Sequence, residues 1–172
     1  MMPHDRPSEV DETVRRALEL FASGFNCAES VLMALAERWG VPEENIPAVA
    51  TAFGGGIASR GGPCGALTGA LMAYGARGGR REAEDIETKK AVNEMAERFI
   101  DSFAREAGSW LCRDLIGLDL RRPEDKDRFK AEKVRETKCP RFVKAAVEIA
   151  LSSGKQQGGI GVGLPEKISP GW

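Results

Sequence analysis

Cysteine is the residue type in this sequence that is best suited to chemistry, because its thiolate binds soft metals and takes part in redox reactions. The chain has 172 residues and contains four cysteines. They stand alone and far apart, at Cys27, Cys64, Cys112 and Cys139. No CxxC pair is present, so the local zinc-finger and c-type haem patterns are absent. Only a folded domain could bring the four thiols together in one metal or redox site.

The first two cysteines lie at predicted helix starts. Asn26 can cap a helix, and Glu29 stands three residues later, as in a capping box. This pattern places Cys27 in the first turn of that helix. Pro63 is favoured at a first helical position, so we expect Cys64 to lie in a first turn as well.

The other two cysteines follow residues that can cap a helix. Ser109 would place Cys112 at the third position of a short helix, and Thr137 would leave Cys139 in or beside the first turn of the last helix. A helix N-terminus carries about half a positive charge and spare N–H donors. We therefore expect these positions to lower the pKa of a thiol and to stabilise a thiolate or an anionic cluster. Three cations are neighbours of these cysteines in the sequence: Arg113, Lys138 and Arg141.

The rest of the sequence predicts the helices that must position the thiols. Helical periodicity or capping signals mark five stretches, at 10–21, 31–39, 82–107, 109–116 and 139–151. The run 63–76, PCGALTGALMAYGA, is small and apolar on nearly all sides, which predicts a helix buried at the centre. Pro42 can open a further short helix that ends near residue 51, with an interruption at Pro47.

Two segments are expected to lack long helices. Residues 53–62, FGGGIASRGG, form a glycine-rich loop, and the highly charged stretch 118–136 is expected to be an exposed connection with one helical turn. The predicted fold is all-α, a compact bundle of about five to seven helices around the small-residue helix, with no significant sheet. We expect a single domain at 9–152, a disordered N-terminal tail at 1–8 and a flexible C-terminal tail at 153–172.

Composition excludes several classes of function. Lys and Arg total 25 and Asp and Glu total 26, so the net charge of −1 gives no reason to expect nucleic acid or an anionic membrane as a partner. The apolar runs are too short and too broken to span a bilayer. The first ten residues contain no apolar segment typical of a signal peptide, so we expect a cytoplasmic protein.

Glycines near Cys64 are candidate supports for a bound group. In the loop, Gly55, Gly56 and Gly62 would let the backbone approach a cluster and present N–H groups to sulfur. Gly65 and Gly69, four residues apart, would let another helix pack against the Cys64 helix. The alternative is that all five are only loop and packing glycines. The phosphate-binding pattern GxxxxGK[ST] is absent, and GGIGVG near the C-terminus does not complete GxGxxG, so no nucleotide is expected.

Four local motifs carry a resemblance to a known family. They read FNCAESVL around Cys27, CGALTG at Cys64, CRDLIG at Cys112 and KCPRFVKAA at Cys139. Together they resemble a bacterial and archaeal family of redox-active proteins named for the pattern C-GCAxxG-C-C, over residues 18–149. The resemblance implies a small helical protein whose four cysteines hold a prosthetic group, an iron–sulfur cluster. A related domain accompanies haem in the split-Soret cytochromes, but this chain lacks a haem-attachment motif, so no haem is expected.

Three hypotheses follow for the cysteines. The first is electron transfer by an iron–sulfur cluster, with [2Fe–2S] favoured over [4Fe–4S] and a redox partner that the sequence does not identify. The second is metal-free thiol–disulfide chemistry in a redox enzyme or sensor. The third is a structural zinc site, which a chain with a substantial apolar core does not need for folding.

A stand-alone enzyme is less favoured than an electron-transfer or accessory protein. The carboxylates of Glu94, Glu97 and Asp101 share one face of a predicted helix, but Lys90 and Arg98 lie beside them, as on a salt-bridged surface. The small-residue helix could pack within one chain or against a second copy, which would give a homodimer.

Overall fold

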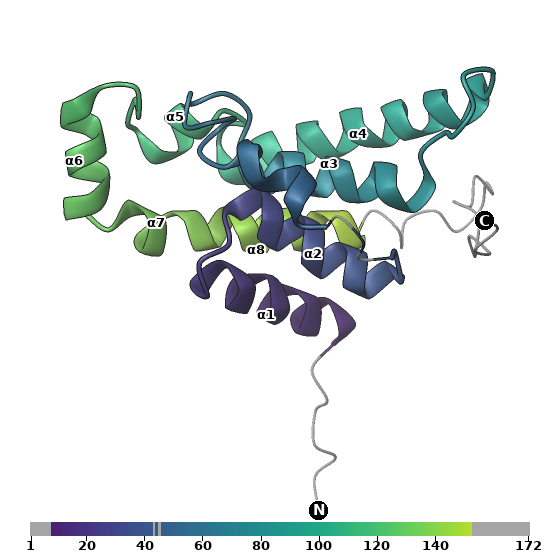
Figure 1. Ribbon diagram of the computed structural model, residues 1–172, viewed down its shortest axis with the longest axis horizontal. Coiled ribbons are helices and arrows are strands. Elements are labelled where there is room, and N and C mark those ends of the chain that lie inside the picture. Colours follow the sequence, from purple (N-terminus) through teal and green to yellow (C-terminus); the bar gives the residue numbers. More distant parts are fainter. Residues whose placement is uncertain (1–7, 43, 45, 153–172) are drawn as a thin grey trace, which may run out of the picture.

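The computed structural model describes residues 8–42, 44 and 46–152, and over these ranges the fold is all-α, as predicted (Figure 1). The described residues contain eight α-helices, one 3-10 helix and no strand. Two of the α-helices are very short, which brings the number above the five to seven expected. In chain order the elements are α1 (Glu9–Ala22), α2 (Cys27–Trp39), η1 (Ala48–Phe53), α3 (Gly65–Gly78), α4 (Ile86–Ala107), α5 (Cys112–Ile116), α6 (Pro123–Ala131), α7 (Val134–Thr137) and α8 (Cys139–Ser152).

The helices α2 and α3 form the centre of the bundle. They pack extensively against each other, and both also contact α8. In Figure 1, α4 lies on one side of this pair and α1 on the other, while α5, α6 and α7 gather at one end. The small-residue helix is thus central, as predicted, and α2 shares that position with it.

Glycine lets α2 and α3 approach closely. A β-carbon on Gly69 would lie 2.4 Å from the carbonyl oxygen of Ala28, which real side chains essentially never do. The expectation that Gly69 accommodates a neighbouring helix is therefore confirmed. The small residues of α3 serve packing within one chain, and the homodimer stays a prediction.

Aromatic side chains fill the core between α2, α3 and α4. The ring of Tyr74 stacks on Trp39 at a centroid distance of 5.6 Å and meets Phe99 edge-on at 5.6 Å. Phe99 in turn lies 6.3 Å from Phe103. Tyr74 is buried and forms part of this core.

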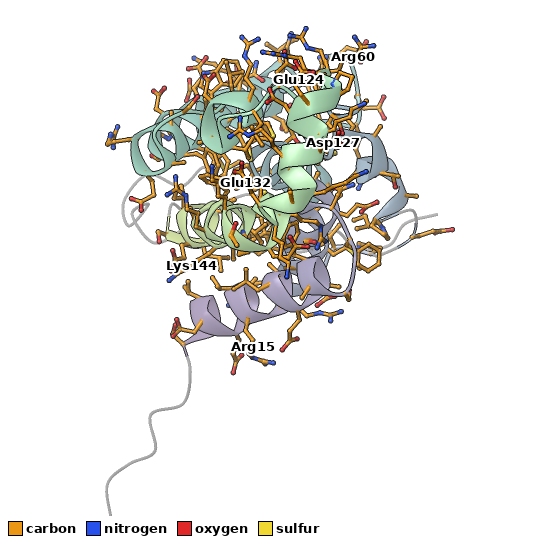
Figure 2. All side chains as sticks on the ribbon, turned by 90° about the vertical axis from the view of Figure 1, so that its left-hand side faces the viewer. Arg15, Arg60, Glu124, Asp127, Glu132 and Lys144 are labelled. Atoms are coloured by element: carbon orange, nitrogen blue, oxygen red, sulfur yellow. The ribbon has the colours of Figure 1, made fainter. Side chains whose placement is uncertain are left out.

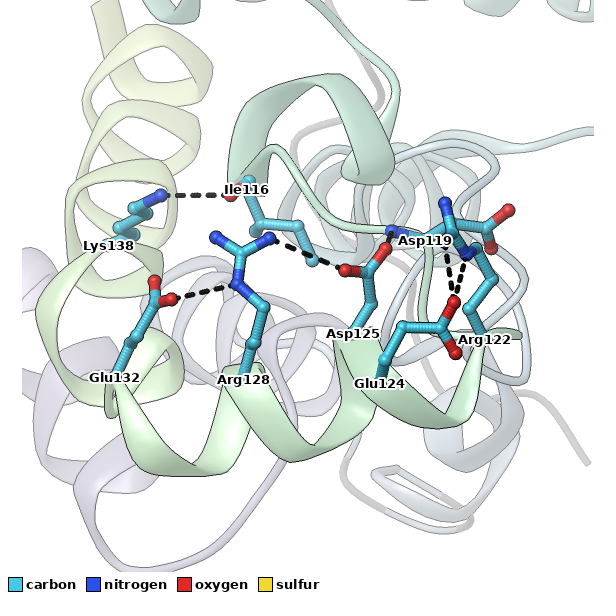
Figure 3. Close-up of polar contacts among 8 residues, drawn as sticks. All are labelled: Ile116, Asp119, Arg122, Glu124, Asp125, Arg128, Glu132 and Lys138. Carbon is cyan, nitrogen blue, oxygen red and sulfur yellow. Dashed lines mark hydrogen bonds and ion pairs between the residues drawn. The ribbon is translucent and has the colours of Figure 1, made fainter.

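The prediction for residues 118–136 is correct in that α6 buries no residue, but it is wrong in expecting one helical turn, because the stretch forms both α6 and α7. Three of its apolar residues are buried in a small cluster with Cys112: Leu118, Leu120 and Val134. The charges lie on the solvent side of α6, where Figure 2 shows Glu124, Asp127 and Glu132. Ion pairs with helical spacing support that face, because Arg128 contacts Asp125 at 3.5 Å and Glu132 at 3.0 Å (Figure 3).

Other boundaries differ less. Of the residues described there, Pro42 and Glu44 lie outside any helix, and the segment after Pro47 forms the 3-10 helix η1. The longest helix starts at Ile86, not near residue 82, because the side chain of Asp85 accepts a hydrogen bond from the amide of Thr88 and caps it.

The predicted tails fall largely outside the described residues. Ser8, which was assigned to the N-terminal tail, caps α1 in a capping box with Asp11. Residues 1–7 and 153–172 are not described, so the two tails and the GGIGVG segment stay predictions. No helix in the described part of the chain combines the length and the apolar character needed to cross a membrane.

Candidate functional site

All four cysteines lie at helix starts. Cys27, Cys112 and Cys139 are the first residues of α2, α5 and α8, and Cys64 is the N-cap of α3. Two positions are shifted from the prediction, because Cys64 precedes the first turn and Cys112 is the first helical residue, not the third.

The predicted caps of the last two cysteine helices are wrong. The hydroxyl of Ser109 accepts a hydrogen bond from the amide of Leu111 at 3.1 Å, but Leu111 is itself the N-cap of α5, so Ser109 lies two residues too early to cap the helix. The hydroxyl of Thr137 donates to the carbonyl oxygen of Lys133 at 2.9 Å and belongs to α7. Short polar residues near helix starts are ambiguous in sequence, because they bond equally well to the preceding turn.

The structure brings the four thiols to one cavity of about 340 Å³. All four are free, two of them buried (Cys64 and Cys112) and two half-buried (Cys27 and Cys139). Most of the remaining lining is apolar or backbone. Among the described residues, no group of three or more His, Cys, Asp or Glu side chains is arranged to hold a metal ion.

A hydrogen-bond network fixes the start of α2, where Cys27 lies. The Asn26 side chain accepts bonds from the amides of Ala28 and Glu29 at 2.9 and 3.1 Å, and the Glu29 carboxylate accepts from the Asn26 amide at 2.8 Å. This is the capping box that the sequence predicted. Thr51 extends it to η1, because its hydroxyl donates to Glu29 at 2.7 Å and its carbonyl accepts from the Asn26 side chain at 3.0 Å.

A short antiparallel pairing joins the segments that carry Cys64 and Cys112. The amide of Cys64 donates to the carbonyl of Trp110 at 2.8 Å, and the amide of Cys112 donates to the carbonyl of Gly62 at 2.7 Å. Pro63 and Leu111 form the isolated bridge between these two bonds. Two cysteines separated by 47 residues in the sequence are thereby placed next to each other.

The glycine-rich loop contains an unusual left-handed turn. Five successive residues, 55–59, have positive φ angles between 49° and 71°. Three of them are not glycine, and a left-handed backbone is strained for Ile57 in particular, because its side chain is branched at the β-carbon. Strained backbone is concentrated at functional sites, where the surroundings hold it in place. Here the turn ends against the site, since Ala58 and Ser59 line the cavity.

The predicted glycines lie against the cysteines, with one exception. A β-carbon on Gly56 would lie 2.7 Å from the β-carbon of Cys112, and one on Gly65 would lie 2.5 Å from the Cys27 sulfur. The Gly62 carbonyl binds the Cys112 amide as described above, and the Gly55 amide faces the Cys27 sulfur. Gly69 lies against Ala28 and serves helix packing, not the cavity.

Burial raises the pKa of Cys27 and of Cys64, and for Cys64 it does so well above the ordinary value of 9.0. The prediction that helix starts lower these pKa values is therefore wrong, because the desolvation of a thiolate outweighs the helix terminus. The expected donors are nevertheless present. Backbone amides, led by that of Gly55, act in the opposite direction on the pKa of Cys27, and the amides of Ala66 and Leu67 do so on that of Cys64.

Burial also raises the pKa of Cys112 and of Cys139 to about 12. In both cases the next cause is the charge of Cys27, and the pKa of Cys112 is also raised by Cys139. The charge on one thiolate therefore opposes the ionisation of the other thiols in the cavity. The charges of Arg135 and Lys138 lower the pKa of Cys139, and the charge of Glu136 raises it.

Arg135 is a site residue that the sequence interpretation missed. It lines the cavity, and its Nη2 donates to the carbonyl of Phe21 at 2.5 Å and to that of Phe25 at 3.0 Å. Its guanidinium carbon lies 4.1 Å from the centre of the Phe21 ring. No signal in the sequence distinguished this arginine from the other cations of the charged stretch 118–136, because its partners lie more than 100 positions away.

The three cations chosen from the sequence do not line the cavity. Lys138 donates to the carbonyl of Ile116 at 2.9 Å (Figure 3), which ties the end of α5 to the start of α8. Arg141 lies over the ring of Phe142 at 4.6 Å, and Arg113 lies 3.8 Å from Asp114 at the surface.

Comparison with known proteins agrees with the cysteine pattern. The sequence profile of the family described as "Putative redox-active protein (C_GCAxxG_C_C)" matches residues 25–152. A protein of Archaeoglobus fulgidus described as "Uncharacterized protein" is 34% identical over 157 residues, which cover 87% of this chain and 97% of that protein. No solved structure matches the chain significantly. The chain belongs to the C_GCAxxG_C_C family of redox-active proteins.

Proposed function

We propose that Cys27, Cys64, Cys112 and Cys139 hold an iron–sulfur cluster, [2Fe–2S] in preference to [4Fe–4S], and that the protein transfers electrons. The observation that carries the proposal is that four thiols from four separate helix starts line one cavity. Four thiolates are the usual ligand set of both cluster types. Such a cluster takes up and releases single electrons when it is bound.

The size of the cavity that the four thiols line favours a cluster over a single zinc ion. Zinc binds each sulfur at about 2.3 Å, so its ligands must converge on one point. A cluster with several iron atoms distributes its sulfur ligands over a larger volume, which suits four thiols around a cavity of about 340 Å³.

The surroundings suit a buried anionic group. Backbone amides at the starts of α2 and α3 and in the glycine loop face the sulfurs of Cys27 and Cys64, and N–H donors to sulfur stabilise the more negative state of a cluster. Three aromatic side chains contribute to the apolar lining of the cavity: Phe21, Phe129 and Phe142. Metal binding replaces the thiol protons, so the raised pKa values make loading dependent on pH.

Metal-free thiol–disulfide chemistry is less well supported. A nucleophilic thiol needs an accessible thiolate, and its pKa is usually lowered to achieve that. The pKa values of Cys112 and Cys139 are raised to about 12 in this protein.

The proposal also includes a cytoplasmic location and a separate partner protein that exchanges electrons with the site.

The test is metal analysis of anaerobically purified protein. We expect a coloured protein with iron and acid-labile sulfide in equal amounts, about two of each per chain for [2Fe–2S] and about four for [4Fe–4S]. A colourless protein without iron after anaerobic reconstitution would refute the proposal. Stoichiometric zinc would support the structural alternative, and a metal-free dithiol with a reversible potential would support thiol chemistry.

A pair of variants tests the ligand set. Cys112→Ser should abolish retention of the cluster, because it removes one of the four sulfur ligands. Ser102→Ala, a change of similar size on α4, should retain a full complement of iron. Unchanged iron content in Cys112→Ser would show that Cys112 is not a ligand.

A further inference from the structure

The cavity at the four cysteines has one charged side chain in its lining, as far as the chain is described, and that side chain is Arg135. Two features hold it in place. Its Nη2 binds the carbonyl oxygens of Phe21, near the end of α1, and of Phe25, in the following loop. Its guanidinium also rests on the Phe21 ring at 4.1 Å. An arginine held in this way has little freedom to turn away into solvent.

The charge of Arg135 is not neutralised by a carboxylate. Within residues 8–42, 44 and 46–152, no Asp or Glu forms an ion pair with it. Its polar partners are two uncharged carbonyl groups. A positive charge that is half-buried and lacks a counterion acts on nearby negative charge more strongly than a solvated surface cation does.

We propose that Arg135 is a positioning residue that offsets the negative charge of the four-sulfur site and thereby raises its reduction potential. This inference rests on the proposed function. Reduction by one electron, supplied by a one-electron donor that is itself oxidised, adds one negative charge to the site. The guanidinium stabilises the reduced state more than the oxidised state, so its removal lowers the potential.

Arg113 is the cation with which the effect of Arg135 on the reduction potential can be compared. Arg113 follows Cys112 directly in the sequence, but it lies at the surface near Asp114 and does not line the cavity. If proximity in the sequence decided the effect, Arg113 would matter as much as Arg135. The geometry predicts that it does not, because solvent and a carboxylate screen its charge.

The experiment is an anaerobic redox titration of the reconstituted full-length protein, followed by visible absorption. We expect the midpoint potential of Arg135→Gln to fall by about 59 mV, which for one electron is a tenfold change in the reduction equilibrium. Arg135→Lys keeps the charge and should restore most of the wild-type potential. The control Arg113→Gln should shift the potential by less than a third of the Arg135→Gln effect. Equal potentials in Arg135→Gln and the wild type, or an equal shift in Arg113→Gln, would overturn the inference.

A structural role is separated from the charge effect by two further measurements. Thermal unfolding of the cluster-free variants reports the loss of the Phe21 and Phe25 hydrogen bonds, which should affect Arg135→Gln and Arg135→Lys alike. Arg135→His serves if Arg135→Gln does not fold, because an imidazole gains its charge near pH 6.5. Its potential should then rise from pH 8.5 to pH 5.5 by more than the wild-type potential does, and an identical pH dependence would overturn the inference. A wild-type protein without iron would instead overturn the proposed function, and this inference with it.

Discussion

The first residues of α2 and α3 meet with no space between them: a β-carbon on Gly65 would lie 2.5 Å from the sulfur of Cys27 and 3.0 Å from the carbonyl oxygen of Phe53. The sulfur of Cys27 therefore depends on the missing side chain of Gly65 for its position. It is also the sulfur whose charge raises the pKa of each of the other three cysteines.

Gly65→Ala should destabilise the fold by about 1–3 kcal/mol, the usual effect of overpacking, and should reduce cluster retention. The matched control is Gly75→Ala in the same helix, where a β-carbon meets nothing within 4 Å. That change should stabilise the protein by about 0.5–1 kcal/mol, because alanine favours a helix interior. Urea denaturation and iron content measure both effects. Equal stability of the two variants would contradict the close contact.

Gly56→Ala should disturb the start of α5. Its β-carbon would lie 2.6 Å from the amide nitrogen of Gly62 and 2.7 Å from the β-carbon of Cys112. Gly117 has a φ angle of 73°, close to the 71° of Gly56, but a β-carbon built on Gly117 would meet no atom within 4 Å. Gly117→Ala therefore carries the backbone strain alone. Chemical denaturation should show a larger loss for Gly56→Ala, by about 1–3 kcal/mol, and only Gly56→Ala should lose iron. Similar losses in both variants would count against the contact with Cys112.

Asn26→Ala should destabilise the protein by about 1–2 kcal/mol, because it removes the cap of α2 and the bond to Thr51. It should also lower cluster retention, since Cys27 is the next residue. Ser8→Ala removes the equivalent cap of α1, which is exposed and lies outside the cavity lining. That control should show a loss of stability of about 1 kcal/mol with full iron content. Iron loss in both variants would show that general instability, not the position of Cys27, is responsible.

The cluster-free protein should lose stability in alkali. The pKa of Cys112 and that of Cys139 are raised by burial from 9.0 to about 12 in the folded state. Below about pH 9 the thiols are protonated in both the folded and the unfolded state, and the fold keeps its full stability. As the pH rises from there towards 12, the unfolded chain loses its thiol protons more readily than the folded chain, so the free energy of unfolding decreases. The denaturation midpoint should therefore fall across this window. Cys112→Ala should flatten the fall, and a midpoint that does not change between pH 9 and 11 would contradict the raised pKa values.

The helical class could be predicted from sequence, and so could the exact position of Cys27, because local rules govern both. Asn26 and Glu29 form a capping box within four residues. The small residues of α3 indicate that another helix packs closely against it. The helices of the charged segment 118–136 could not be predicted, because α6 buries no residue and Leu118, Leu120 and Val134 are too few to form a helical apolar pattern.

The remaining features of the site depend on contacts between distant segments. Arg135 binds carbonyl groups more than 100 positions away, and no local pattern distinguishes it from its charged neighbours. The left-handed turn at 55–59 includes Ile57, Ala58 and Ser59, whose own preferences favour a right-handed or extended backbone. Only the tertiary surroundings make that conformation acceptable.

The last cysteine of the site opens the final described helix, α8. During synthesis the chain emerges from its N-terminus, so the first three cysteines exist for some time before Cys139 is available to complete the set. α8 also packs on α1, α2, α3 and α4, so the cavity acquires its final wall at the same step as the core. The complete set of four thiols therefore exists only once the chain also contains the helix that closes the core.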